Sequence, residues 1–183
     1  MIKEDINLIH KAIIFATQKH AGQMRKGTDI PYITHPMEVM QILSADGYSE
    51  TIIVAGILHD TLEDTDATKD EILNLFGQDI LNIIVAESED KSKTWKERKQ
   101  ATIDQLEDAH LDIKAVCMAD KLANLRSMNA DKSVIGDKLW ERFNALKTDI
   151  EWYYRQVFVM MSDLKSTKMK NEYQSLLEEV FKE

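Results

Sequence analysis

The sequence predicts an all-α protein, folded as a single helical bundle of about eight or nine helices. Only two prolines and six glycines interrupt the 183 residues, so few positions break a helix. Apolar residues recur at helical spacing along most of the chain, and no alternating strand pattern with hairpin turns is present. With 44% hydrophobic residues, the chain is long enough for one core and short for two, so residues 1–183 are expected to form one domain.

The N-terminal part of the chain is expected to hold three helices. The first runs from about residue 5 to residue 20 and is followed by a polar loop, AGQMRKGTDIPYITH, over residues 21–35. Pro36 suits the first turn of a second helix, which stops near Gly47. The third helix carries the apolar run TIIVAGIL and the segment ILHDTLED, residues 57–64.

Two capping boxes mark later helix starts. Thr68 with Glu71, and Thr94 with Glu97, have the S/T-x-x-E spacing in which side chain and backbone cap each other. Gly77 suits the C-terminal end of the earlier of these two helices.

Three more helices are expected in the rest of the chain. Residues 112–129, DIKAVCMADKLANLRSMN, have the apolar spacing of a core helix. A long helix is expected from about residue 137 to residue 163, and an amphipathic one, NEYQSLLEEVF, over residues 171–181.

The charge of the chain excludes some partners. A formal net charge of −9 argues against attraction to a nucleic acid polymer or to an anionic membrane. A small anionic substrate can still be captured, because lysines and arginines are concentrated at residues 25–26 and in KSKTWKERK, residues 91–99.

The location indicated by the sequence is cytoplasmic. No segment reaches the roughly 18 uninterrupted apolar residues of a membrane span, and the N-terminus lacks the apolar core of a signal peptide. The single cysteine, Cys117, cannot form a disulfide within the chain, which suits a reducing compartment.

The segment ILHDTLED concentrates ionisable groups behind an apolar run. If it is helical, His59 lies one turn from Glu63, and Asp60 lies one turn from Asp64. Three anions and an imidazole on one turn repel and desolvate one another, so a fold tolerates them only with compensation. A divalent cation would compensate them.

Two other places put metal-binding residue types in apolar surroundings. His35 lies in PYITHP, and Asp120 with Asn124 lies in MADKLAN, one helical turn apart. With the His59–Asp60 pair, they come from three different expected helices, and a bundle can converge such ligands on one interior point. Two imidazoles with two carboxylates suit Mn²⁺, Fe²⁺ or Zn²⁺, and ligand type alone does not choose among them.

These motifs resemble those of a known family. The order His…His-Asp…Asp, with HDxxED and ADxLxNxR, is similar to that of the HD-domain metal-dependent phosphohydrolases. Within them it resembles the alarmone hydrolase branch, meaning the hydrolase domain of Rel/SpoT proteins and the small alarmone hydrolases of the Mesh type. The resemblance spans residues 10 to about 130 through KHAGQMRKG, PYITHP, ILHDTLEDT and ADKLANLRS. It implies the HD-domain fold and removal of the 3′-pyrophosphate of guanosine tetra- or pentaphosphate, (p)ppGpp.

The resemblance also implies roles for the residues of the site. It makes the four metal ligands His35, His59, Asp60 and Asp120, and it implies Mn²⁺ as the ion, with Fe²⁺ or Zn²⁺ as alternatives. It assigns Glu63 and Asp64 to catalysis, where a carboxylate beside metal-bound water can orient that water and accept its proton.

Substrate contacts are implied at five positions. Arg25 and Lys26 would contact the purine and its phosphates, and Asn124 would hold the sugar or a phosphate. Lys91 and Arg98 are candidates for the remaining phosphates, with a solvated helix start as the alternative for this basic cluster.

Some questions stay open at this level. His20 either shapes the site or makes a structural hydrogen bond. The loop RKGTDIPY is one residue longer than the pattern usual in the family, and Ala123 stands where Rel proteins often carry histidine, so the base is uncertain. Two alternatives remain: an HD phosphohydrolase acting on another nucleotide or dinucleotide, and a non-catalytic nucleotide-sensing helical module. Glu63 and Asp64 count against the latter, and the oligomeric state is undetermined.

Overall fold

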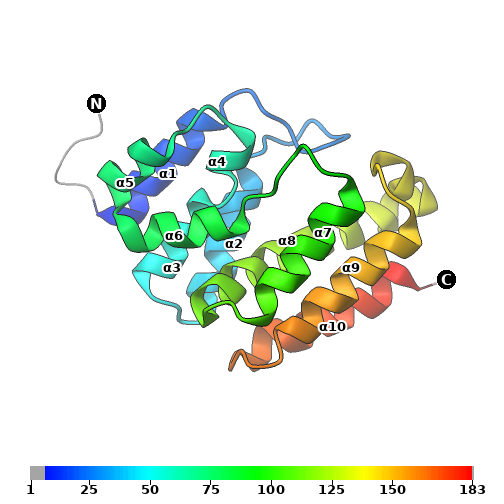
Figure 1. Ribbon diagram of the computed structural model, residues 1–183. Coiled ribbons are helices and arrows are strands. Elements are labelled where there is room, and N and C mark those ends of the chain that lie inside the picture. The colour runs from blue at the N-terminus through cyan, green and yellow to red at the C-terminus, as the bar shows by residue number, and fades with distance from the viewer. Residues whose placement is uncertain (1–6, 183) are drawn as a thin grey trace. The chain divides into compact units, whose positions relative to one another are not determined.

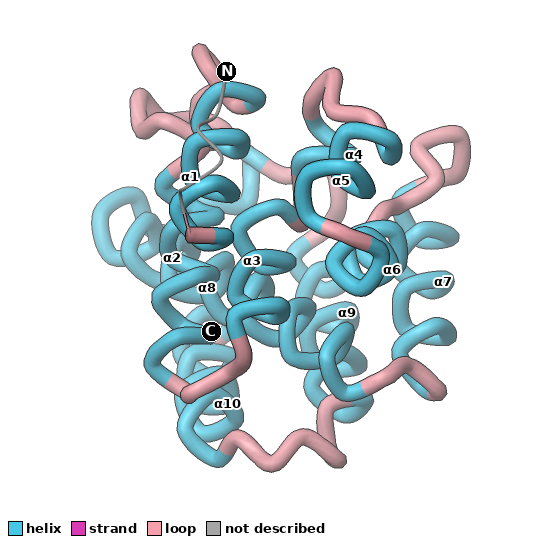
Figure 2. The backbone as a smooth tube through the Cα atoms, turned by 90° about the vertical axis from the view of Figure 1, so that its left-hand side faces the viewer, coloured by secondary structure: helices cyan, strands magenta, loops and turns pink. Residues whose placement is uncertain are grey.

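The computed structural model describes residues 7–182 and confirms the all-α fold (Figure 1). Ten α-helices and one 3-10 helix make up the regular structure of these residues, and loops join them (Figure 2). The β-structure within the same range is one isolated bridge between Met24 and Pro31. The chain divides at Ser88 into two compact units, here called unit 1, up to Ser88, and unit 2, from Glu89 onward. The single-domain expectation stays a prediction.

Unit 1 is built around one buried helix. Its helices are α1 (Leu8–Lys19), α2 (Thr34–Ala45), α3 (Glu50–Leu58), α4 (Thr61–Asp64), α5 (Lys69–Phe76) and α6 (Gln78–Glu87). Residues 52–58 of α3 are all buried, as expected for a helix that is apolar on every side. Helices α1, α2 and α6 each pack against α3.

Gly56 allows α2 and α3 to pack closely. A Cβ atom added at Gly56 would lie 2.5 Å from Leu43 Cδ1 and 3.1 Å from Val39 Cγ1, and both of these α2 side chains are fully buried. Such separations are too short for any residue with a side chain unless the buried Leu43 side chain or α2 shifts. Glycine therefore favours close packing between the helix that carries His35 and the helix that ends just before His59.

The expected third helix is broken at His59 and Asp60, so its continuation through ILHDTLED was wrong. Helix α3 ends at Leu58, and α4 forms a single separate turn. The Thr61 hydroxyl donates to the Leu58 carbonyl at 2.6 Å, and His59 Nδ1 donates to the Gly56 carbonyl at 2.8 Å. These side chains compete for carbonyls at the end of α3, which favours ending the helix.

Other boundaries in unit 1 follow the local signals. Helix α1 has Asn7 as its N-cap, and the start expected near residue 5 lies outside the described residues. Pro36 is in the first turn of α2. The capping box of Thr68 and Glu71 is complete, and Gly77 ends α5 with a φ of +89°, which glycine adopts without strain.

Unit 2 packs its helices around α8. Its elements are α7 (Trp95–Glu107), α8 (Leu111–Ile135), the 3-10 helix η1 (Gly136–Arg142), α9 (Lys147–Met160) and α10 (Thr167–Phe181). Residues 114–120 of α8 are buried, and α8 packs against η1, α9 and α10. The second capping box, Thr94 with Glu97, begins α7 as expected.

The long helix expected over residues 137–163 was wrong. It is divided into η1 and α9, and the backbone is extended at Phe143 and Leu146. No glycine or proline lies between these two residues to signal the break. The Trp140 ring stacks on Phe181 of α10, with centroids 5.3 Å apart, so tertiary packing overrides the local helical preference.

None of the helices in the described range combines the length and the apolar character that crossing a membrane requires.

The packing at Gly56 leads to a stability prediction. Gly56→Val should lower the free energy of unfolding by about 1–3 kcal/mol, because the added methyl groups overpack the α2–α3 contact. Urea unfolding measures this change. Thr51→Val, on the same helix and without a change of shape, should stay within about 0.5 kcal/mol of the parent. An unchanged midpoint for Gly56→Val would mean that the Leu43 side chain or α2 yields without cost, and that glycine is not required at this contact.

Candidate functional site

Three of the four predicted metal ligands lie together in unit 1. His35 is the second residue of α2, while His59 and Asp60 form the turn between α3 and α4. Asp60 Oδ2 lies 2.9 Å from His59 Nε2 and 3.6 Å from His35 Nε2. The two imidazole rings have centroids 5.2 Å apart, and both side chains are buried. Close packing of α2 on α3 thus brings residues from two helices to one carboxylate.

This donor set fits a divalent metal ion. Ligand atoms bound to one ion at 2.0–2.2 Å lie about 3 Å apart, which is close to the nitrogen–oxygen separations in this cluster. The Nδ1 atom of His59 donates to the Gly56 carbonyl, so Nε2, on the side of Asp60, is the ring atom left to bind a metal. His35 and His59 are both buried and could serve as metal ligands.

Asp120, the fourth predicted ligand, lies in unit 2. It is on α8 and only 5% exposed. Asn124 Nδ2 donates to Asp120 Oδ1 at 2.7 Å, and Lys121 forms an ion pair with the other carboxylate oxygen. The spacing of one helical turn therefore joins Asp120 and Asn124 as expected. Their meeting with the ligands of unit 1 stays a prediction.

Glu63 and Asp64, the predicted catalytic pair, lie on α4. The backbone N–H of Asp64 donates to the Asp60 carbonyl at 2.9 Å. Asp60 and Asp64 therefore remain one helical turn apart, although the longer helix is broken. Gln23 Nε2 donates to the Asp64 carbonyl at 2.7 Å and ties α4 to the loop before α2. Glu63 is half-buried and Asp64 is exposed.

Arg25 and Lys26 lie on that loop, at its turn. The backbone N–H of Arg25 donates to Ile30 at 2.8 Å, and Gly27 has a φ of +73° between them. The Arg25 guanidinium lies 5.7 Å from the centre of the Tyr32 ring. Lys26 is exposed and Arg25 is half-buried.

Sequence reasoning missed Tyr32 and Gln23. The Tyr32 hydroxyl donates to Asp60 Oδ2, and the Gln23 side chain lies between His20 and Asp64. Both residues stand inside KHAGQMRKG and PYITHP, the stretches that carry the family resemblance. For His20, the structure supports the structural alternative, because Nδ1 lies 2.7 Å from Gln23 Oε1.

In unit 2, the basic cluster is organised by Glu89. Arg98 Nη1 and Lys99 Nζ lie 2.9 and 2.6 Å from the two oxygens of Glu89, whose side chain is only 12% exposed. The Lys99 ammonium also lies 4.9 Å from the centre of the Tyr153 ring. Arg98 is therefore not part of a solvated helix start, whereas Lys91 is exposed in the loop before α7.

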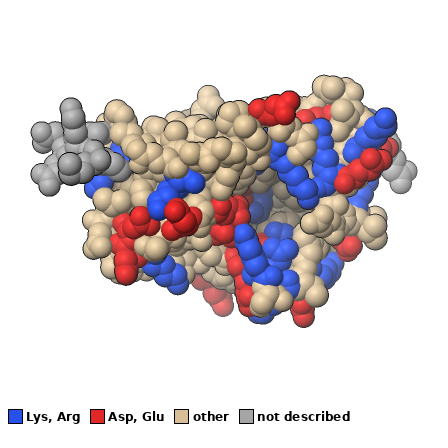
Figure 3. Space-filling model, turned by 90° about the horizontal axis from the view of Figure 1, so that it is seen from above, with Lys and Arg blue, Asp and Glu red and all other residues tan. Residues whose placement is uncertain are grey.

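Burial and charge act in opposite directions on Glu89. Burial acts to raise the pKa of its carboxyl group, but Lys99, then Lys121 and Arg98, outweigh this effect and hold the pKa below its usual value. Burial, with help from Lys121, lowers the pKa of the Lys99 ammonium. Lys and Arg side chains lie among Asp and Glu side chains on the face drawn in Figure 3, so positive groups are present there although the net charge of the chain is −9.

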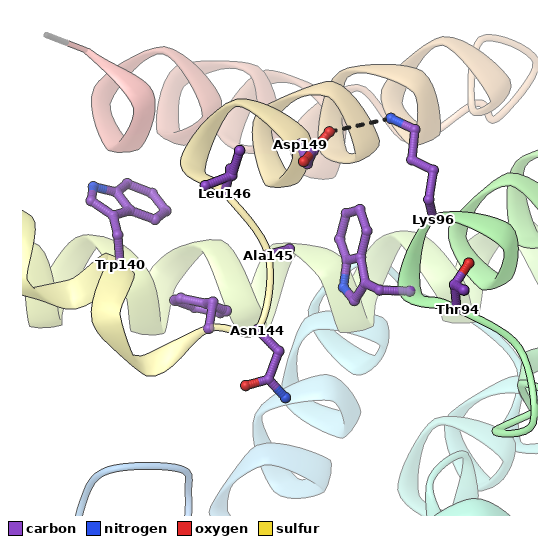
Figure 4. A pocket seen from close by; sticks show the side chains of 9 residues that line it. Thr94, Lys96, Trp140, Asn144, Ala145, Leu146 and Asp149 are labelled. Carbon is purple, nitrogen blue, oxygen red and sulfur yellow. Dashed lines mark hydrogen bonds and ion pairs between the residues drawn. The ribbon is translucent and has the colours of Figure 1, made fainter.

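A cavity of about 670 Å³ in unit 2 contains none of the predicted site residues. It is lined by residues 94–96 and by residues between Trp140 and Asp149. Lys96 and Asp149 reach toward each other and pair at 3.4 Å (Figure 4). Two of its aromatic rings pack against other helices, Trp140 on Phe181 and Trp95 edge-on to Tyr153.

Known proteins are similar in sequence to this chain. Residues 12–143 match a family model described as HD domain. Over 130 residues, the chain is 40% identical to the Xenopus tropicalis protein named guanosine-3′,5′-bis(diphosphate) 3′-pyrophosphohydrolase MESH1, covering 69% of this chain and 73% of that protein. The human protein of the same name is 39% identical over 122 residues, covering 65% of this chain and 68% of its own.

Solved structures show the same fold. The crystal structure of lmo0812 from Listeria monocytogenes superposes with a TM-score of 0.75 at 34% identity, covering 81% of this chain and 99% of that one. A metazoan orthologue of SpoT, described as hydrolysing ppGpp, superposes with a TM-score of 0.79 at 24% identity, covering 95% and 96% of the two chains.

The ion pairs of Glu89 lead to a prediction about pH. Because its folded pKa is lowered, Glu89 contributes stability above its unfolded pKa of about 4.3, and this contribution is lost as pH falls through the folded pKa. Glu89→Gln should cost about 1–3 kcal/mol at pH 7 and should reduce the loss of stability between pH 7 and pH 3. Urea unfolding across that range measures both effects.

The matched control is Glu179→Gln, which makes the same change of charge at an exposed position of α10. It should leave the pH profile of the parent in place. A Glu89→Gln profile parallel to that of the parent would show that the ion pairs with Arg98 and Lys99 add no stability.

Proposed function

Because the chain belongs to the HD-domain family, we propose that it is a metal-dependent phosphohydrolase that removes the 3′-pyrophosphate of guanosine tetra- or pentaphosphate, giving GDP or GTP. The observation that carries this proposal is the cluster of His35, His59 and Asp60, with Glu63 and Asp64 one turn further along the chain. The identity shared with the two MESH1 pyrophosphohydrolases supports the choice of substrate.

The metal site in this proposal has four ligands. They are His35, His59, Asp60 and Asp120, and the ion is Mn²⁺, with Fe²⁺ or Zn²⁺ as alternatives. When bound, a divalent ion would supply a bound water of lowered pKa and a positive charge beside the phosphoryl oxygen. Asn124 supports the assignment of Asp120, because its amide holds one oxygen of that carboxylate in place. In the proposal Asn124 also hydrogen-bonds the nucleotide.

Glu63 and Asp64 handle the proton and the orientation of water in this reaction. A half-buried carboxylate such as Glu63 can accept a proton from water, and Asp64, next to it, can orient that water. Their placement one turn after a metal ligand supports these roles, since α4 is held by the Asp60 carbonyl and by Gln23.

The substrate is bound by local positive charge in a protein of net charge −9. Arg25 and Lys26 contact the base and phosphates in the proposal, while Lys91 and Arg98 contact the remaining phosphates. The guanidinium of Arg25 can both stack on a purine and bind a phosphate in bidentate fashion. The pairing of Arg98 with Glu89 supports a fixed orientation for its guanidinium.

We further propose that residues 1–183 work as one catalytic domain, since the proposed ligands come from both units. The partner is a small anionic nucleotide, neither a nucleic acid polymer nor a membrane, and the compartment is the cytoplasm. The net charge and the single buried cysteine support this assignment.

An assay of pyrophosphate release tests the function. Purified protein with Mn²⁺ should release pyrophosphate from guanosine tetraphosphate, and chelation of the metal should stop the release. A panel of guanine and adenine nucleotides tests the alternative substrate, which the longer loop after Arg25 keeps open. Release from an adenine nucleotide in preference to the guanine alarmone would overturn the substrate assignment. Nucleotide binding without any hydrolysis would contradict the hydrolase and support the alternative of a non-catalytic nucleotide-sensing module.

Two substitutions separate binding of metal from catalysis. Asp60→Ala should abolish metal content and activity together, because it removes the carboxylate shared by both histidines. Glu63→Gln should retain the metal and lower kcat by about 10²–10⁴-fold, because it loses the proton acceptor. Elemental analysis and steady-state kinetics measure these effects. Loss of metal from Glu63→Gln would make Glu63 a ligand instead.

Arg25 provides a test of base stacking. Arg25→Lys keeps the charge but loses the planar group, so the KM for guanosine tetraphosphate should rise about fivefold, as expected from the loss of roughly 1 kcal/mol of stacking. Metal content should not change. Lys26→Arg is the control, since it conserves charge at the neighbouring position and should alter KM less. A KM equal to that of the parent in Arg25→Lys would show that this residue supplies charge alone.

A further inference from the structure

Tyr32 lies at the end of the loop between α1 and α2, and both its backbone N–H and its backbone carbonyl are hydrogen-bonded. Its N–H donates to the Gln23 carbonyl at 2.9 Å, and its carbonyl accepts from the His35 N–H at 2.9 Å. The start of α2, with the proposed ligand His35, is thereby connected through Tyr32 to the beginning of the loop.

The side chain of Tyr32 makes two different kinds of contact. Its ring centroid lies 4.9 Å from that of His20 and 5.9 Å from that of His35, and the Arg25 guanidinium lies 5.7 Å from its centre. Its hydroxyl, at the other end of the ring, donates to Asp60 Oδ2. The ring therefore lies beside Arg25 of the loop and beside the two histidines, and the hydroxyl contacts the carboxylate.

The carboxylate of Asp60 needs such a partner. It stands at the turn between α3 and α4, and its Oδ2 lies near both His59 Nε2 and His35 Nε2 at the separations given above. A donor from outside the cluster that bonds this oxygen fixes the direction in which the carboxylate points. Residues that hold ligating carboxylates in this way influence metal affinity strongly.

We infer that Tyr32 is a positioning residue, whose hydroxyl orients Asp60 for metal binding and whose ring supports Arg25 for substrate binding. The inference rests on the proposed function for the identity of the metal ligand and of the substrate. Among the common side chains, tyrosine provides an aromatic face together with a hydroxyl donor at its far end, and so it can perform both tasks. The two tasks can be separated by substitution.

Tyr32→Phe removes the hydroxyl and retains the ring. Metal-free protein titrated with Mn²⁺ in a calorimeter, without nucleotide, should bind about 10–100-fold more weakly in this variant than in the parent. The Mn²⁺ concentration that gives half-maximal kcat should rise by a similar factor. An affinity for Mn²⁺ equal to that of the parent would overturn the inference.

The matched control is Tyr173→Phe. The Tyr173 hydroxyl is hydrogen-bonded as well, donating at 3.0 Å to the Tyr154 carbonyl in unit 2, and Tyr173 is fully buried whereas Tyr32 is half-buried. This variant should lose thermal stability without any change of Mn²⁺ affinity. A weaker affinity in both variants would show that general destabilisation, rather than the bond to Asp60, causes the effect, and would overturn the inference.

Tyr32→Leu tests the ring. At saturating Mn²⁺, this variant should raise the KM for guanosine tetraphosphate several-fold more than Tyr32→Phe does, because only the leucine variant removes the support of Arg25. Equal KM values in the two variants would overturn the role of the ring.

A failure of the proposed function and a failure of the inference about Tyr32 would give different results. A parent that binds Mn²⁺ but releases no pyrophosphate would contradict the hydrolase, while weaker Mn²⁺ binding by Tyr32→Phe would still support the role of the hydroxyl. A parent that binds no divalent ion would overturn both.

Discussion

The close approach of α2 to α3 at Gly56 is the constraint on which the site in unit 1 depends. A side chain at this position would meet the buried side chains of Leu43 and Val39, so glycine favours the separation at which His35 and His59 face the same carboxylate. The Gly56 carbonyl also accepts the hydrogen bond that orients the His59 ring. One residue thus contributes both to the spacing of two helices and to the direction of a proposed ligand.

Like charges lie close together in both units, carboxylates in unit 1 and Lys and Arg side chains in unit 2. In unit 1, the acidic turn after α3 is accommodated because Asp60 accepts from Tyr32 and faces two imidazoles, an arrangement suited to a cation. In unit 2, Arg98 and Lys99 converge on the single carboxylate of Glu89, an arrangement that keeps positive charge in a fixed place. In the proposed function, the first arrangement would hold the metal and the second would contact phosphates.

The breaks in helices were the least predictable part of the fold. The end of α3 depends on which carbonyls the side chains of His59 and Thr61 reach, and the same residues could also continue a helix. The division between η1 and α9 depends on the stacking of Trp140 with Phe181, a residue of a different helix. Neither break coincides with a glycine or proline, so composition offered no signal of either.

The sequence by itself determined the all-α class, both capping boxes and the pairing of Asp120 with Asn124, because each depends on residues within one helical turn. The residue types of the proposed metal site were equally readable, and all four of its ligands remain predictions. Only the tertiary structure decided that Tyr32 bonds Asp60, 28 positions away, and that Gln23 bonds Asp64, 41 positions away. Such contacts are set by the path of a loop and the packing distance of helices, and no local pattern of residues encodes either.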